Sequence, residues 1–132
     1  MVSELYTAVT FSSKRFTPVL PEESQVNPGR YGAELAFWLC AKLAGEGVVT
    51  SYPEYEDWGW FVEYISPDGD EFWLACGNVD GTNDIWHCFL IPKKKGLFGR
   101  KPDNHRARPL LEALESILQS ESTVHSVNWE SE

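Results

Sequence analysis

The sequence predicts an α+β protein, with an antiparallel sheet of about four to six strands and two amphipathic helices packed on one face. Three observations predict this class. Apolar residues recur with a helical period in two separate segments, and they alternate with polar residues in most of the others. Pro-Asp-Gly and Asp-Gly sequences, typical of tight hairpin turns, separate the alternating segments. Two helical stripes and one sheet bury their apolar sides best against each other, in two layers.

The length of 132 residues fits one domain. A domain of this size buries roughly two thirds of the surface that its unfolded chain exposes, so one core supports it. The hydrophobic fraction of 42%, with 6 Trp, 5 Tyr and 7 Phe, supplies that core. We therefore expect a single folded domain over residues 1–132.

The first half of the chain predicts a strand and then a helix. Residues 5–11 alternate loosely and favour a strand, and the prolines and the Asn-Pro-Gly turn of residues 12–29 favour a loop. Residues 30–44 are rich in alanine, which favours a helix, and Gly45 is a typical helix end. One stripe of this helix is apolar: Tyr31, Leu35, Trp38, Leu39 and Leu43.

The middle of the chain predicts a meander of strands. We expect these strands near residues 48–52, 58–65, 72–76 and 85–91, with turns at 66–70 and 78–83. Alternation places Trp58 and Trp60 on one side of their strand, with Val62 and Tyr64. We interpret the two tryptophans as core residues, and the rim of a binding surface is the alternative.

The last third predicts an exposed loop, a second helix and an edge strand. Residues 92–102 hold two prolines, two glycines and five basic residues, typical of an exposed basic loop. Its segment Lys93–Lys101 could contact phosphate or an acidic partner, although a solvated loop is the simpler interpretation. The helix is expected from Asp103 to Ser120, with a strand in residues 123–129.

The three cysteines predict buried free thiols. Cys40, Cys76 and Cys88 are odd in number, form no Cys-x-x-Cys pair and lie in apolar runs, unlike a secreted disulfide framework. The first residues lack the pattern of a signal peptide, and no run approaches the roughly 18 apolar residues of a membrane helix. We expect a cytoplasmic protein that makes no membrane contact.

Charge is distributed unevenly along the chain, whose net charge is −9. Residues 54–84 contain nine carboxylates and no Lys or Arg, whereas residues 93–108 contain seven basic residues and one acid. An acidic body argues against binding to nucleic acid or anionic membranes and favours a basic protein surface as partner. Acidic hairpin tips that keep the protein soluble are the simpler alternative.

One part of the acidic segment combines carboxylates with aromatic residues, as binding hot spots often do. This combination predicts a partner-binding site at Tyr52, Glu54, Tyr55, Glu56 and Asp57.

Catalytic and metal-binding patterns are weak. The three histidines are far apart, and no metal-ligand spacing, phosphate loop or dinucleotide-binding glycine pattern is present. We therefore name no catalytic residue, metal or cofactor. The alternative is a small-ligand pocket or enzyme cleft between sheet and helices, lined by Trp60, Asp84 and His87.

Two short strings resemble a group of small bacterial proteins of unknown function. They are Gly-Ala-Glu-Leu-Ala at residues 32–36 and Glu-Asp-Trp-Gly-Trp at residues 56–60. Such proteins often resemble immunity proteins, which neutralise toxins delivered by neighbouring cells. The resemblance covers about residues 16–91, together with the last helix and strand, and excludes the basic loop. It implies a similar fold and an inhibitor role.

These observations favour a non-catalytic, intracellular protein-binding module, with an immunity or inhibitor protein as the leading hypothesis. The ligand-binding protein or enzyme with a cleft near His87 is the second hypothesis. A structural or oligomerisation protein, associating through the edge of the meander, is the third.

Overall fold

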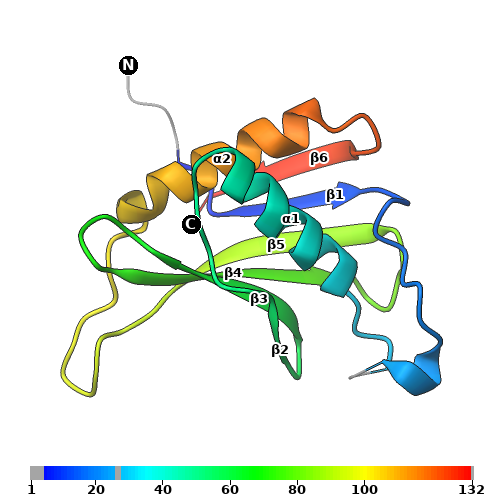
Figure 1. Cartoon of the computed structure of the whole chain (residues 1–132), viewed down its shortest axis with the longest axis horizontal. Helices are drawn as coiled ribbons and strands as arrows, with labels where there is room; N and C mark the ends of the chain where they lie inside the picture. Colours follow the sequence, from blue (N-terminus) through cyan, green and yellow to red (C-terminus); the bar gives the residue numbers. More distant parts are fainter. Residues whose placement is uncertain (1–4, 26–27, 132) are drawn as a thin grey trace.

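The computed structural model describes residues 5–25 and 28–131, and it contains one antiparallel sheet of six strands with two α-helices (Figure 1). The α+β class is confirmed. The strands run in the order β2-β3-β4-β5-β1-β6. The elements are β1 (Ala8–Ser12), η1 (Glu22–Ser24), α1 (Ala33–Gly45), β2 (Glu54–Glu56), β3 (Gly59–Ile65), β4 (Glu71–Asn78), β5 (Ile85–Pro92), η2 (Asn104–Ala107), α2 (Arg108–Ser120) and β6 (His125–Glu130).

The central meander of β3, β4 and β5 forms as the turn sequences predict. At the first turn, the amide of Gly69 donates to the carbonyl of Ser66 over 2.9 Å, and Gly69 has a φ of 85°. Glycine adopts this positive φ freely, whereas a residue with a Cβ would be strained there. The second turn places Asp80 and Gly81 at φ values of 46° and 76°. Both hairpins therefore follow from local turn chemistry.

The two ends of the chain meet at the other side of the sheet. β1 pairs with β5 through Val9 and Cys88, and with β6 through Val9 and Trp129. The predicted C-terminal edge strand is therefore present, as β6. β6 forms one edge of the sheet and pairs with β1, the first strand of the sequence.

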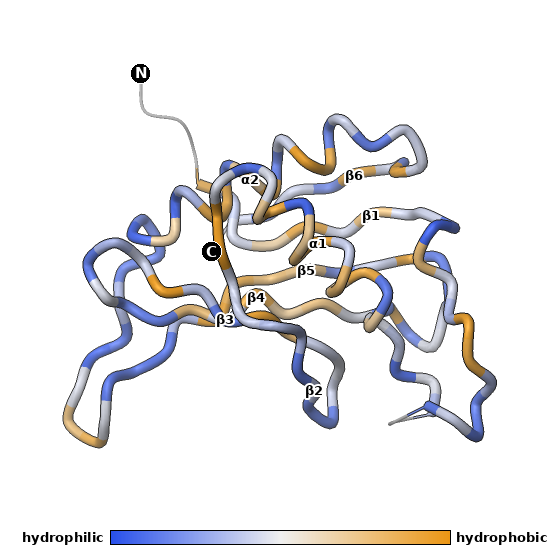
Figure 2. The backbone as a smooth tube through the Cα atoms, viewed as in Figure 1, coloured by the Kyte–Doolittle hydropathy of each residue, from blue (hydrophilic) through white to orange (hydrophobic). Residues whose placement is uncertain are grey.

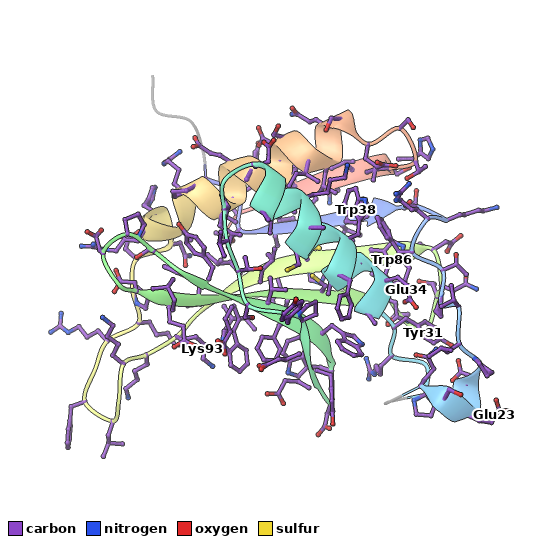
Figure 3. All side chains as sticks on the ribbon, in the orientation of Figure 1. Glu23, Tyr31, Glu34, Trp38, Trp86 and Lys93 are labelled. Carbon is purple, nitrogen blue, oxygen red and sulfur yellow. The ribbon has the colours of Figure 1, made fainter. Side chains whose placement is uncertain are left out.

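The core fills one face of the sheet, and both helices contribute to it. In Figure 1, α1 crosses in front of the strands. Trp86 is fully buried, and its indole nitrogen donates to the carbonyl of Ser13 over 2.9 Å; Figure 3 labels it beside α1. The largest buried side chains of this cluster are Val9, Phe11, Phe16, Leu35, Leu39, Leu43, Val62, Phe72, Leu74, Trp86, Leu110 and Leu114.

The helix ends follow local rules. α1 begins after Gly32, whose φ is 144° and whose position lies so close to β4 that a Cβ would approach the Cys76 carbonyl oxygen to 2.8 Å. Glycine is therefore required there. The second helical segment begins with the 3₁₀ turn η2, where the carboxylate of Asp103 accepts from the amide of His105 over 2.8 Å. Asp103 thus caps this segment as the sequence predicts, and α2 follows.

One predicted strand is wrong. Residues 48–52 form an irregular connection and not a strand, and Val49 is 76% exposed. The only backbone hydrogen bond that links this segment to β3 within the described residues runs from Ser51 to Glu63. A ladder needs repeated bonds, and the amide of Val48 is instead used to end α1, where it donates to the carbonyl of Leu43. The short β2 forms only after Pro53, which has no amide hydrogen to donate.

The prediction that Trp58 and Trp60 lie on one side of their strand is also wrong. Trp60 pairs with Cys76 and packs on the core, whereas Trp58 lies in the turn before β3 and is 38% exposed. Its ring lies 6.3 Å from Phe61 and 6.0 Å from Phe89, two residues of the other face. Gly59, with a φ of 154°, breaks the alternation between the two tryptophans.

The thiols of Cys76 and Cys88 are buried and face each other across β4 and β5, with 4.0 Å between their sulfur atoms. Cys40 is partly buried, and all three cysteines are free. The hydrogen bond to Cys76 and burial raise the pKa of the Cys88 thiol well above its ordinary range. The predicted buried thiols are confirmed for Cys76 and Cys88. Across the described residues, no helix has the length and apolar character needed to cross a membrane.

Candidate functional site

The acidic aromatic surface predicted from the sequence lies on β2 and on the connection before it. We use this name for Tyr52, Glu54, Tyr55, Glu56 and Asp57. Tyr52 is 80% exposed and Tyr55 is 58% exposed, although tyrosine rings in a domain of this size usually pack against the body. Glu54 and Asp57 are exposed and Glu56 is half-buried. The structure therefore brings the five predicted residues together on one edge of the sheet.

Hydrogen bonds fix the backbone that presents these side chains. On one side, the Cys40 thiol of α1 donates to the carbonyl of Ser51 over 3.4 Å, and the Thr50 hydroxyl donates to the Cys40 sulfur over 3.5 Å. On the other side, the amide of Glu63 in β3 donates to the Ser51 hydroxyl oxygen over 2.9 Å. The connection is therefore held to both α1 and β3. Tyr52 projects into solvent from an anchored backbone.

An apolar groove lies next to this surface, between α1 and the connection. It has a volume of about 340 Å³ and is lined by Phe37, Cys40, Ala41, Ala44, Thr50 and Tyr52. Phe37 is 53% exposed, although it belongs to a helix whose opposite side packs in the core. Tyr52 belongs to both the groove and the acidic aromatic surface, so the two features meet at this residue. Alternation along β2 then turns Tyr55 to the face of Trp60, and Glu54 and Glu56 to the opposite face with Phe61.

Sequence reasoning missed the α1 side of this site. The signal was present, because α1 has apolar residues around most of its circumference, with Glu34 and Lys42 as its only charged residues. An amphipathic surface helix has a polar outer side, whereas α1 presents Phe37, Ala41 and Ala44 there. An outer side of this kind indicates a contact with something other than water.

Charge around the site has a single sign along the neighbouring strands. Residues 54–84 carry no Lys or Arg, and the carboxylates of β2, β3 and β4 lie close enough to affect one another. Partial burial raises the pKa of Glu63, and the nearby carboxylates of Glu71 and Glu54 raise it further, while Lys93 opposes them. This edge of the sheet therefore favours a cation over a second anion.

The predicted ligand pocket at Trp60, Asp84 and His87 is not formed. Trp60 lies on the core face, and His87 lies on the opposite face because its neighbour Cys88 is in the core. Asp84 lies elsewhere, at a hollow of about 430 Å³ lined by Ser12, Ser13, Lys14, Arg15, Asp84, Ser122, Thr123 and His125. The expectation was wrong because His87 was assigned to the helix side of β5.

His87 instead belongs to an aromatic group on the face of the sheet that carries no helix. Its ring stacks on Phe89 with 4.9 Å between centroids, and Phe61 stacks on Trp73 at 3.9 Å. Burial lowers the pKa of His87, and the negative charge of Glu130 opposes this shift.

In residues 5–25 and 28–131, no cluster of three or more His, Cys, Asp or Glu side chains could hold a metal ion. The turns at residues 66–70 and 80–84 contain carboxylates. However, Asp68 and Asp70 bind the guanidinium of Arg106, with nitrogen–oxygen distances of 2.6 and 3.5 Å. Asp68 and Asp70 therefore form an ion pair that joins the turn between β3 and β4 to η2.

Comparison with protein-family models, with curated proteins and with solved structures found no match to this chain. The fold and the site define a small α+β protein with a compact acidic and apolar surface. Any function must be argued from that surface itself.

Proposed function

We propose that this chain is a non-catalytic protein-binding module, and that it acts as an inhibitor of the immunity-protein kind. The carrying observation is that one anchored tyrosine, Tyr52, is 80% exposed beside an apolar groove and lies two residues before the first carboxylate of β2. Exposed aromatic residues with a charged rim are typical of binding hot spots. An apolar groove next to them provides the area that a partner side chain needs.

The partner that fits this site is a basic protein surface with an apolar side chain at its centre. Glu54, Glu56 and Asp57 would face Lys or Arg residues of the partner, and the groove beside Phe37 would receive the apolar side chain. Complementary charge speeds the encounter of two proteins and disfavours wrong partners. A toxin that binds nucleic acid has a basic site of this kind, so this acidic surface would cover it well.

We place the protein in the cytoplasm. The three free cysteines, two of them fully buried, support a reducing compartment. An inhibitor of this kind protects the cell from inside, which is consistent with that location.

The experiment is an affinity capture from host lysate, with the wild-type chain and matched variants as bait. The site variants are Glu54→Lys/Glu56→Lys and Tyr52→Ala. The control is Glu23→Lys/Glu115→Lys, which makes the same change of charge on η1 and α2, away from β2. We expect one basic partner that is retained by the wild type and the control and is lost from both site variants.

Two results would contradict the proposal. One is a partner that binds the site variants as well as it binds the wild type. The other is the capture of acidic partners alone. Circular dichroism of each variant checks that a loss of capture does not come from a loss of fold.

A further inference from the structure

The loop between β5 and η2 projects from the body of the protein and ends in two exposed apolar side chains. Leu97 is 78% exposed and Phe98 is 95% exposed, which makes Phe98 the most exposed large apolar residue of the described chain. Figure 1 shows this loop extending away from the sheet, and Figure 2 shows an apolar tip between hydrophilic flanks. Full exposure of a phenylalanine costs free energy unless the ring finds an apolar environment.

Basic residues flank this tip on both sides. Lys94, Lys95, Arg100 and Lys101 are all exposed. None of these four makes a salt bridge with any residue in 5–25 or 28–131. The positive charge beside the tip is therefore available to a partner.

The base of the loop is held in place, so the tip has a defined direction. The ammonium of Lys93, which is labelled in Figure 3, lies 3.8 Å from the centre of the Trp73 ring, a cation–π contact that fixes the first residue after β5. At the other end, Arg106 binds Asp68 and Asp70 of the turn between β3 and β4. Both ends of the loop are thus attached to the sheet, and the residues between them project outward.

We propose that this loop docks the protein on an anionic lipid bilayer surface. Leu97 and Phe98 insert between the headgroups, while Lys94, Lys95, Arg100 and Lys101 lie in the headgroup region and contact lipid phosphates. An apolar tip with flanking cations combines the two attractions that hold peripheral proteins at membranes, burial of apolar area and electrostatic attraction. An acidic protein with an apolar pocket for Phe98 is the alternative occupant, and the vesicle experiment below distinguishes the two.

The acidic body opposes this docking only weakly. Charges are screened over about 8 Å at physiological ionic strength, so carboxylates well behind a projecting tip have little effect at the lipid surface. Asp103, at the end of the loop, is bonded to His105, and Arg106 pairs with both Asp68 and Asp70 of the neighbouring turn. The loop therefore presents net positive charge to the membrane although the chain as a whole carries −9.

Sedimentation with vesicles tests the proposal directly. The full chain is mixed with vesicles of phosphatidylcholine alone and with vesicles that also contain phosphatidylglycerol, and the bound fraction is measured at low and high salt. We expect binding only to the anionic vesicles. Leu97→Ser/Phe98→Ser should reduce the partition coefficient roughly tenfold or more because it removes the inserted apolar area. Lys94→Glu/Lys95→Glu should reduce it by roughly twentyfold or more.

Matched controls separate the loop from the rest of the surface. Val19→Ser/Leu20→Ser removes another exposed apolar pair, which has no cluster of cations beside it, and should leave vesicle binding unchanged. Unchanged unfolding midpoints show that the variants remain folded.

The proposal is overturned if the wild type does not bind anionic vesicles, or if it binds them equally well without Leu97 and Phe98. The second result would indicate adsorption by charge alone. Capture of an acidic protein through Lys94 and Lys95, with no vesicle binding, would overturn it in favour of a protein partner.

Discussion

Both faces of the sheet carry aromatic residues, but the structure uses them differently. On the core face, Phe11, Phe72 and Trp86 have almost no exposed surface and pack against the helices. On the other face, Trp58 is 38% exposed and Trp73 is half-buried. The aromatic residues of this second face contact one another, and the ammonium of Lys93 lies over the Trp73 ring.

The difference shows that aromatic content alone does not define a core. Residues of one strand alternate between the faces, so adjacent aromatic residues such as Phe72 and Trp73 have opposite environments. The face with the helices determines the fold, whereas the other face contributes smaller local stabilisation. Replacing residues in matched pairs measures this difference.

The largest effect is expected for Phe72→Ala in comparison with Trp73→Ala. Phe72 is fully buried, so its loss should lower the free energy of unfolding by about 3–5 kcal/mol. Trp73 stays half-exposed and stacks on Phe61 and Lys93, and its loss should cost about 1–2 kcal/mol. Urea unfolding of both variants gives the two values. Equal losses of unfolding free energy would contradict the claim that the two faces contribute differently to stability.

A smaller effect is expected where α1 meets the sheet. Gly32→Ala should lower the free energy of unfolding by about 2 kcal/mol, because its φ is 144° and the new Cβ would meet the Cys76 carbonyl oxygen. Gly45→Ala is the control, since no atom lies within 4 Å of a Cβ there, and it should be neutral or slightly stabilising. Thermal unfolding measures both, and a neutral Gly32→Ala would contradict the close approach.

The cation–π contact on the open face should have a modest effect. Lys93→Ala is expected to cost about 0.5–1 kcal/mol because the ammonium lies 3.8 Å from the Trp73 ring centre. Lys94→Ala removes an equal charge from an exposed position and should change stability little. Urea unfolding compares the two, and equal effects would show that Trp73 does not bind the Lys93 ammonium.

The smallest effect is expected for pH dependence. Burial holds the pKa of His87 below 6.5, so the unfolded chain takes up a proton at His87 before the folded chain does. Stability should therefore fall as the pH drops below about 6.5, and part of this fall should be absent in His87→Phe. Unfolding at about pH 7.5 and 5.5 measures it. A wild type and a variant with the same dependence would show that His87 does not contribute.

The fold followed from the sequence wherever local chemistry decides structure. The turns at Gly69 and Gly81, the stripe of α1 and the C-terminal edge strand are all local patterns, and the structure contains each of them. The errors lie where tertiary contacts override such patterns. Residues 48–52 have the composition of a strand, but bonds to α1 and β3 on its two sides hold them in an irregular path.

The site was predictable only in part. The grouping of the acidic aromatic surface was predicted correctly although a neighbouring strand was not, because its five residues are close in sequence: Tyr52, Glu54, Tyr55, Glu56 and Asp57. The groove at Phe37 depends on how α1 packs against a connection that was predicted to be a strand, and it was missed. The prediction of a pocket at His87 was wrong for a related reason. The sequence does not show which face of β5 the helices cover, and therefore does not show on which face His87 lies.

The most direct measurement of the central claim is the association rate constant of the captured partner at low salt. The claim predicts that Glu54→Lys/Glu56→Lys slows association by roughly tenfold or more, with a smaller change in dissociation, and that added salt reduces the difference. The control Glu23→Lys/Glu115→Lys should associate almost as fast as the wild type. If the site variant associates as fast as the wild type at low salt, the acidic aromatic surface is not where the partner binds.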